Sequence, residues 1–314
     1  MKSVVNKLIS LIITVLVISF VTFIVFSIIP GNAAIAKLGV DASPEQIERL
    51  EEEMGLNDPI VLRYGKWLLN ALKGDFGESL QYSGTKVSAL LSSRLQVTLV
   101  LSLLSMGLIL LFSFPISLLC VRHQGKWVDA LLSGLGQVLM AVPAFFLGIM
   151  ITYLLGLVLH FFKPGAYIPL SENPSRAVLY LLFPAISIAL PKISMTVRFL
   201  KSSIQGELSQ DYVRTARSHG MSQGKVLSAH VLKNALIPVI TFLATIIAEI
   251  MAGSIVAEQV FSVPGIGRLL ITSISARDFP VVQAIVMYIT SVVVTAGFVM
   301  DILYILVDPR LRRK

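Results

Sequence analysis

Long apolar runs alternate with short polar segments along the 314 residues of this chain. A helix needs about 20 apolar residues to cross the hydrocarbon core of a bilayer. Six stretches meet this requirement, and they cover residues 8–29, 97–120, 131–160, 178–200, 236–257 and 281–307. The pattern therefore predicts an all-α integral membrane protein with six transmembrane helices.

Prolines interrupt two of these stretches. Pro143 falls inside the third stretch, and Pro184 and Pro191 fall inside the fourth. Because proline removes a backbone donor and bends a helix, these three positions are candidate bends. Interrupted helices often line transport cavities, so the same prolines are also candidate residues of a transport pathway.

The first stretch shares features with a secretory signal. Lys2 and Lys7 give it a basic start, and Ala34-Ile35-Ala36 is similar to a cleavage site. Its apolar run of 22 residues exceeds the core of a signal peptide, which has roughly 7–15 residues. We therefore expect a retained transmembrane helix within residues 1–30.

The polar segment that follows is expected to fold in water as two helices. Ser43 and Gln46 have the spacing of a capping box around the start of the first helix. That helix is expected to stop at Gly55. A second helix is expected between Pro59 and Gly74, with an apolar face for the membrane surface or for neighbouring spans.

The chain therefore divides into a first span at 1–30, an extracytoplasmic helical segment at 31–96, a core of five spans at 97–307 and a tail at 308–314. The core contains a polar loop at 201–235. Two interpretations of the outer segment stay open, and they are compatible. It is either a structural cap or a contact surface for an external protein that delivers substrate.

Charge placement sets the expected orientation. Only 14% of the residues are charged, against about 25% in a soluble domain, and the net charge is +8. The basic residues lie at the ends of the apolar runs and form no single patch, which is typical of membrane orientation and not of nucleic-acid binding. With both termini inside, the inner segments hold 13 Lys and Arg residues and the short outer loops hold 4. We therefore expect both termini in the cytoplasm.

The polar segment from Asp211 to Pro238 separates the fourth and fifth spans. It predicts a short helix, a break at Gly220 and a second short helix, with Ser222 as a candidate cap for the second. The first helix has an apolar face made by Tyr212, Val213 and Ala216, with Arg214, Arg217 and Lys225 at its rim. Two interpretations of this helix remain: a docking element for a soluble partner, or an amphipathic helix that only anchors the loop.

The sequence contains none of the nucleotide-binding, metal-binding or hydrolase motifs considered below. The stretch from Gly220 to Val226 has three residues between its glycines and a valine after Lys225, so it does not match an ATP-binding loop. The four histidines form no H-E-x-x-H motif, and no G-x-S-x-G is present. We expect no catalytic residue, no metal site and no cofactor bound by this chain.

Several separated motifs resemble one family of membrane proteins. The pattern Y-V-R-T-A-R-x-x-G at 212–220, followed by H-x-L-K-N-A-L-x-P at 230–238, resembles the cytoplasmic loop of binding-protein-dependent ABC importer permeases. The chain is most similar to the B-type permeases for dipeptides, oligopeptides and nickel. Further matching motifs are IPG at 29–31, GDFGESL at 74–80, VFSVPGIGRLL at 260–270, RDFPVVQA at 277–284 and DPRLRR at 308–313. The usual loop begins Glu-Ala-Ala, whereas this chain has Arg214-Thr215-Ala216.

The resemblance implies a type I importer fold in a bacterial or archaeal cell membrane. A second homologous permease completes the pore, two cytoplasmic ATPases bind ATP and Mg²⁺, and an extracytoplasmic binding protein delivers the cargo. A helix at 207–220 would dock on one ATPase. The residues implied for this coupling are Glu207, Asp211, Tyr212, Val213, Arg214, Ala216, Arg217 and Gly220. The cargo would be short peptides, or alternatively nickel or a nickel chelate. A stand-alone secondary transporter is the distant alternative.

Ionisable residues within spans are functional candidates by default. Glu249 either lines the pathway and meets a cationic group, or pairs with a charge on the second permease. Arg198 is expected to extend toward the inner interface. Lys192 and Asp301 are the other two intramembrane charges. An outer loop is expected around Pro264, Gly265 and Gly267, and Glu258, just before the VFSVPG sequence, is expected to fix this outer loop in place.

Overall fold

The computed structural model describes residues 2–28, 42–53, 55–82 and 84–307. Three sequence features lie outside these residues: the IPG motif at 29–31, the Ala34-Ile35-Ala36 stretch and the basic tail at 308–314. The side chain of Asp301 also lies outside the described part.

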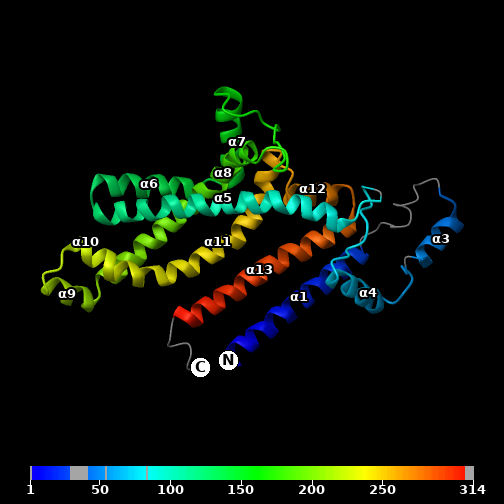
Figure 1. The fold of residues 1–314 in the computed structure, drawn as a ribbon, viewed down its shortest axis with the longest axis horizontal. Coiled ribbons are helices and arrows are strands. Elements are labelled where there is room, and N and C mark those ends of the chain that lie inside the picture. The colour runs from blue at the N-terminus through cyan, green and yellow to red at the C-terminus, as the bar shows by residue number, and fades with distance from the viewer. Residues whose placement is uncertain (1, 29–41, 54, 83, 308–314) are drawn as a thin grey trace. The chain divides into compact units, whose positions relative to one another are not determined.

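Helices make up nearly all of the regular structure in the described residues, and no β-strand occurs among them. An isolated antiparallel bridge joins Glu78 and Lys86. The helices are α1 (Lys2–Ile28), α3 (Pro44–Glu53), α4 (Ile60–Leu72), α5 (Val87–Arg122), α6 (Trp127–Ala141), α7 (Ala144–Ile151), η1 (Thr152–Val158), α8 (Pro174–Leu208), α9 (Asp211–Ser218), α10 (Gln223–Val226), η2 (Leu227–Val231), α11 (Leu232–Val260), α12 (Ile266–Ser275) and α13 (Phe279–Val307) (Figure 1). The segments η1 and η2 are π-helical. The prediction of an all-α membrane protein is confirmed.

Five helical stretches in the described residues are long and apolar enough to cross a membrane. They lie at Asn6–Ile28, Val87–Arg122, Pro174–Leu208, Gln223–Met251 and Phe279–Val299. The third predicted span is a pair of helices, Trp127–Ala141 and Ala144–Val158, which meet at an angle of 99°. Counted as one broken span, this pair brings the total to six.

The break in this pair lies at Val142 and Pro143. Proline disfavours a helical conformation in the residue before it, and Val142 has extended dihedral angles of φ −88° and ψ 123°. The bend predicted at Pro143 is therefore confirmed, whereas a single unbroken helix over 131–160 is wrong. In contrast, α8 continues through Pro184 and Pro191, and both prolines are buried.

The chain forms two compact units. The first comprises residues 1–97 and 264–295, and the second comprises residues 98–263 and 296–314. In the first unit, Val87, Leu91, Ile266, Leu269, Val281, Ala284 and Ile285 form a buried core. In the second unit, α8 packs against α6, α7 and α11.

Aromatic contacts attach α4 to α1 within the first unit. The Tyr64 ring lies 5.0 Å from the Phe20 ring and 5.6 Å from the Phe23 ring, edge-on to both. The Tyr64 hydroxyl is 2.6 Å from the Ser19 hydroxyl. The Trp67 ring lies 5.7 Å from Phe23. The apolar face expected on this helix therefore packs partly on α1, although Leu72 is exposed.

The helix ends predicted at Ser43, Gly55 and Gly74 are confirmed. The Ser43 backbone donates to Gln46 Oε1 at 3.0 Å, and the Gln46 backbone donates to Ser43 Oγ at 3.3 Å, which completes the capping box. Gly55 and Gly74 follow the two helices with φ of +64° and +80°. Glycine adopts these left-handed angles without the penalty of a Cβ.

Two sequence motifs far apart in the chain meet in the first unit. Asp278, from the motif at 277–284, is fully buried. Its carboxylate accepts hydrogen bonds from the Ser79 hydroxyl and from the backbone of Leu80 at 3.1 Å and Gln81 at 3.2 Å. Because a buried carboxylate is costly without such donors, this contact holds the end of the motif at 74–80 against the start of α13.

Candidate functional site

The polar loop is presented at the end of the long helix α8. That helix has 35 residues, which at about 1.5 Å per residue gives about 50 Å, well beyond a hydrocarbon core of about 30 Å. The helices α9 and α10 lie beside each other, next to the adjoining ends of α8 and α11 (Figure 1). At this length, α8 extends beyond the hydrocarbon core at one end or at both.

The expected continuous helix over 207–220 is wrong. Glu207 lies in the last turn of α8, which ends at Leu208, and Gln210 has an extended ψ of 152° before α9 begins at Asp211. A hydrogen bond spans the break, because the Tyr212 hydroxyl donates to Glu207 Oε2 at 2.6 Å. Burial raises the pKa of Tyr212, and the hydrogen bond to Glu207 raises it further.

The apolar face of α9 is directed into the chain itself. Val213 is only 1% exposed, and Tyr212 and Ala216 pack beside it. The cluster that receives them contains Leu200, Ile204, Val226, Leu227, Val231, Ala235 and Val239. The periodicity of these apolar residues is confirmed. Val213 anchors the helix, and its side chain is not available to a partner.

The opposite face of α9 is polar and open. Arg214 and Asp211 form an i,i+3 pair at 3.6 Å, with side chains 79% and 96% exposed. The other exposed residues of this face are Thr215, Arg217 and Ser218. A pair this exposed contributes little to stability. The polar face is thus the surface that α9 offers to another molecule.

The break predicted at Gly220 is present. Gly220 has φ of +78°, and its backbone donates to the Arg217 carbonyl at 2.9 Å. Ser222 occupies the position before α10, but its side chain makes no capping hydrogen bond there. The predicted cap by this side chain is therefore wrong, although the helix begins where expected.

Glu249 pairs with a charge in its own chain. Lys192 of α8 donates a hydrogen bond to the Glu249 carboxylate of α11, and the two side chains are 20% and 43% exposed. On the same two helices, the rings of Phe199 and Phe242 stack at 4.5 Å. The sequence did not predict this pairing, because Lys192 and Glu249 are 57 residues apart.

A second ion pair joins α6 to α8. Lys201 Nζ lies 2.5 Å from Asp129 Oδ1, with both side chains largely buried at 19% and 11% exposure. Ser133 Oγ and the Gly125 backbone also donate to the Asp129 carboxylate. Sequence reasoning missed Asp129. The available signal was an acidic residue in the first turn of an otherwise apolar helix.

The outer loop is shorter than expected. Glu258 lies within α11, is fully buried and accepts a hydrogen bond from Thr98 Oγ1 at 2.7 Å. Gly265 immediately precedes α12, and Gly267 lies in the first turn of that helix. The expectation of a loop at Gly267 is wrong, whereas the role of Glu258 in fixing the loop stays a prediction. In α12, burial of Ile266 and Leu269 in the core of the first unit favours a helix.

In the described residues, no group of three or more His, Cys, Asp or Glu side chains is arranged to hold a metal ion. Of the candidate pathway residues, Pro143 lies at the 99° bend, Pro184 and Pro191 are buried in α8, and Glu249 is partly exposed.

Comparisons with known proteins match nearly the whole chain. Residues 113–313 match the family described as binding-protein-dependent transport system inner membrane component. Residues 1–102 match the N-terminal region of the membrane component of such systems.

Three relatives illustrate the similarity. The chain is 36% identical over 297 residues to a putative peptide transport system permease protein of Brucella abortus, covering 95% of this chain and 94% of that protein. It is 35% identical to the oligopeptide transport system permease protein AppB of Bacillus subtilis, covering 94% of each. It is 32% identical to the glutathione transport system permease protein GsiC of Salmonella typhimurium, covering 99% of each. The chain therefore belongs to the inner membrane components of binding-protein-dependent transport systems, the permease subunits of ABC importers.

Proposed function

We propose that this permease forms half of the translocation pathway of an ATP-driven importer for short peptides. The observation that carries the choice of cargo is similarity over more than nine tenths of the chain to relatives named for peptide, oligopeptide and glutathione transport. A second, homologous permease forms the other half of the pathway. The alternative cargo is nickel or a nickel chelate, carried by an importer of the same architecture.

The polar face of α9 is the contact for a cytoplasmic ATPase. Three features support this role: Val213 anchors the helix, Tyr212 bonds to Glu207 at the end of α8, and Arg214 is exposed. Movement of the docked ATPase is passed to α8 through these contacts. Ala216 supports the packing of α9, Asp211 and Arg217 contribute charge to its surface, and Gly220 permits the turn.

Two ATPase chains hold ATP and Mg²⁺, and this chain binds no cofactor. ATP binding favours one arrangement of the ATPase pair, so its energy shifts the permeases between inward- and outward-facing states. An extracytoplasmic binding protein presents the peptide to the outer side, where residues 31–96 belong. The core at 97–307 carries the pathway, with Glu249, Pro143, Pro184 and Pro191 along it.

Both termini lie in the cytoplasm in this proposal, because 13 basic residues against 4 favour that orientation. The test uses single cysteines at Lys225 and Trp67 in a Cys120→Ser background, labelled in intact cells with a membrane-impermeant reagent. Labelling at Trp67 alone supports the orientation. Labelling at Lys225 alone overturns it.

The cargo is tested with the complete complex in liposomes. The assay measures uptake of radiolabelled dipeptides and tripeptides, and separately of Ni²⁺, with the cognate binding protein outside and ATP inside. ATP-dependent peptide uptake supports the proposal, and ATP-dependent Ni²⁺ uptake without peptide uptake selects the alternative. Uptake by this chain alone, without ATPases, refutes both and identifies a stand-alone transporter.

A further inference from the structure

The helix α11 has two open faces of different chemistry. Thr241, Thr245 and Glu249 recur at intervals of four residues, and each is at least partly exposed. Residues four apart lie on the same side of a helix, so these side chains form a polar stripe. Ile240 and Ile247 are 39% and 41% exposed and, seven residues apart, share another side of the helix. Since Thr245 and Ile247 lie about 200° apart around the helix, the two faces point in different directions.

Lys192 of α8 pairs with the charged end of the polar stripe. It donates to the Glu249 carboxylate, and the two side chains are 20% and 43% exposed. Both residues lie within the apolar runs at 178–200 and 236–257, at least eight residues or about 12 Å from either end. Ionised groups are strongly unfavourable in hydrocarbon. A pair at this depth with an open carboxylate is therefore not directed at lipid acyl chains.

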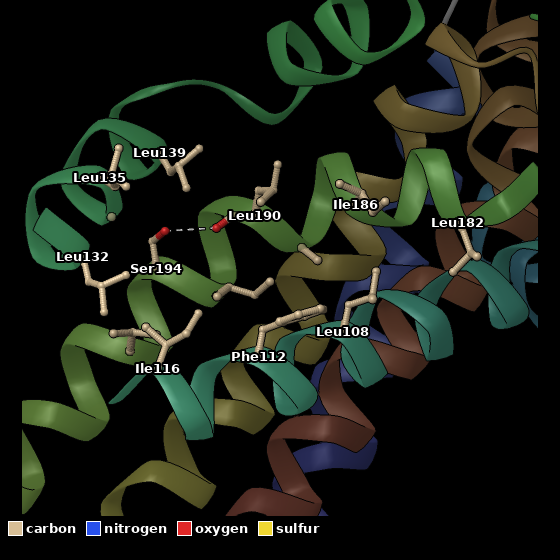
Figure 2. Close-up of a pocket in the computed structure, with 14 residues that line it drawn as sticks. Leu108, Phe112, Ile116, Leu132, Leu135, Leu139, Leu182, Ile186, Leu190 and Ser194 are labelled. Atoms are coloured by element: carbon tan, nitrogen blue, oxygen red, sulfur yellow. Dashed lines mark hydrogen bonds between the residues drawn. The ribbon is translucent and has the colours of Figure 1, made fainter. Parts of the chain in front are cut away.

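A different side of α8 borders an apolar groove of about 510 Å³. Figure 2 shows the side chains that line it, which come from α5, α6 and α8 and include Ile186 and Leu190. Among the described residues, those that line the groove carry no charge, and the Ser194 hydroxyl donates to the Leu190 carbonyl at 3.1 Å. Neither Lys192 nor Glu249 lines it. The groove offers no partner for the charged ends of a peptide, whereas the polar stripe does.

We propose that the polar stripe and Lys192 form part of the wall of a water-filled peptide pathway, and that the ion pair keeps this wall electrically neutral. The inference rests on the function proposed above, because it takes the cargo to be peptides. Glu249 without its partner would attract cationic peptides and repel anionic ones. Lys192 compensates that charge, so peptides with side chains of either sign pass. Lys192 is thus a specificity-determining residue, because it prevents selection by charge.

A helix of the second permease is the competing occupant of this face. The polar stripe needs no group from another chain, because the Thr245 hydroxyl donates to the Phe242 carbonyl of its own helix at 2.7 Å and Glu249 is paired with Lys192. An apolar helix laid over the stripe would remove water from a carboxylate that is 43% exposed. Desolvation of an ion pair is costly, so the charge favours water as the neighbour.

The first test measures which face of α11 is open to water in the assembled importer. Single cysteines replace Thr241 and Thr245 or, as controls at matched depth, Ile240 and Ile247, each in a Cys120→Ser background. The complete complex in liposomes is treated on both sides with a small charged methanethiosulfonate reagent, with and without ATP, and modification of this chain is quantified by mass spectrometry.

We expect the cysteines of the polar stripe to react about tenfold faster or more than their controls in at least one nucleotide state, because a thiolate does not form in hydrocarbon. Equal rates at the matched positions overturn the proposal. So does the absence of reaction at both threonine positions in every state, which would place a helix of the second permease over the stripe.

The second test measures selection by charge. Uptake of alanyl-lysine and of alanyl-glutamate is measured in the complete complex, and each rate is divided by the wild-type rate for the same peptide. This division removes the preference of the binding protein, which is unchanged. Lys192→Met should shift the ratio of the two rates about fivefold toward the lysine peptide, as expected for a unit charge met at contact distance in water. Glu249→Gln should shift it about as far toward the glutamate peptide.

The double variant Lys192→Met/Glu249→Gln is the matched control, because its wall is neutral again. Its ratio should return to within about twofold of the wild-type ratio. Equal loss of both peptides in the two single variants would overturn the proposal, since the pair would then only hold α8 against α11. Failure of the wild-type complex to take up either peptide refutes the peptide cargo instead, and the cysteine reactivity then decides the wall assignment alone.

Discussion

Truncation of Val213 measures how firmly α9 is held. Val213→Ala removes two methyl groups from a side chain that is 1% exposed. At about 0.8 kcal/mol for each carbon, the lost transfer free energy is about 1.6 kcal/mol. The unfilled cavity raises the total to about 2–3 kcal/mol. With eight residues, α9 is too short to be stable as an isolated helix. The lost free energy therefore weakens the packing of α9 against the rest of the chain.

The expected change is large enough to detect. Since about 1.4 kcal/mol corresponds to a tenfold change, the population with α9 detached rises about 30- to 150-fold. Hydrogen exchange in the purified complex reports this local opening. We expect faster exchange at 211–220 and unchanged exchange at 178–200, in the membrane-spanning part of α8. The peptide transported per ATP hydrolysed should fall in the same variant.

Arg214→Ala is the matched control. Its side chain is 79% exposed and pairs with Asp211, which is itself 96% exposed. This variant should leave exchange at 211–220 unchanged while weakening the contact with the ATPase. Two results would refute the reasoning: unchanged exchange in Val213→Ala, or faster exchange with normal coupling. The first removes Val213 as the anchor, and the second removes α9 from force transmission.

Three further outcomes are expected. Gly220→Ala should lower the peptide transported per ATP hydrolysed and destabilise the loop by about 1–2 kcal/mol, because a Cβ is strained at its φ of +78°. Gly224→Ala is the control, since no atom lies within 4 Å of the added Cβ, and it should have neither effect. Equal transport per ATP in the two variants would contradict this prediction. Asp129→Leu should lower the thermal unfolding midpoint, because it leaves the Lys201 charge unpaired at a cost of about 3 kcal/mol. Adding Lys201→Met to this variant should restore the midpoint. If the double variant does not recover, loss of the ion pair is not what destabilises the single variant. Glu249→Gln should reduce the uptake of cationic peptides more than that of neutral peptides. An equal reduction of both in the transport assay would show that the Glu249 charge does not contact the cargo.

Local signals predicted much of the fold. Ser43 and Gln46 specified the start of α3, and Pro143 specified the bend, because both effects act over a few residues. The short helix α12 could not be predicted by span length. Its burial depends on Val87 and Leu91 of α5, which lie far earlier in the sequence. Conversely, Pro184 and Pro191 lie in a continuous α8 because packing on several sides outweighs the local preference of proline.

In the candidate site, too, local features could be predicted from the sequence and contacts between distant residues could not. Helical spacing predicted the apolar face of α9, but not that this face would be buried within its own chain. The two ion pairs join residues 57 and 72 apart, and no local pattern connects them. Glu207 was assigned to the wrong helix, because a break of two residues between α8 and α9 leaves little trace in the apolar pattern.

The Asp278 contact has a consequence for biogenesis. Its carboxylate accepts donors from residues 79–81, so the first unit needs parts of the chain separated by nearly 200 residues. During synthesis, residues 79–81 leave the ribosome long before residue 278 does. That region cannot mature until the final hairpin has been delivered to the translocon. A polypeptide truncated before residue 278 would therefore expose an incompletely folded first unit, which quality-control proteases can recognise.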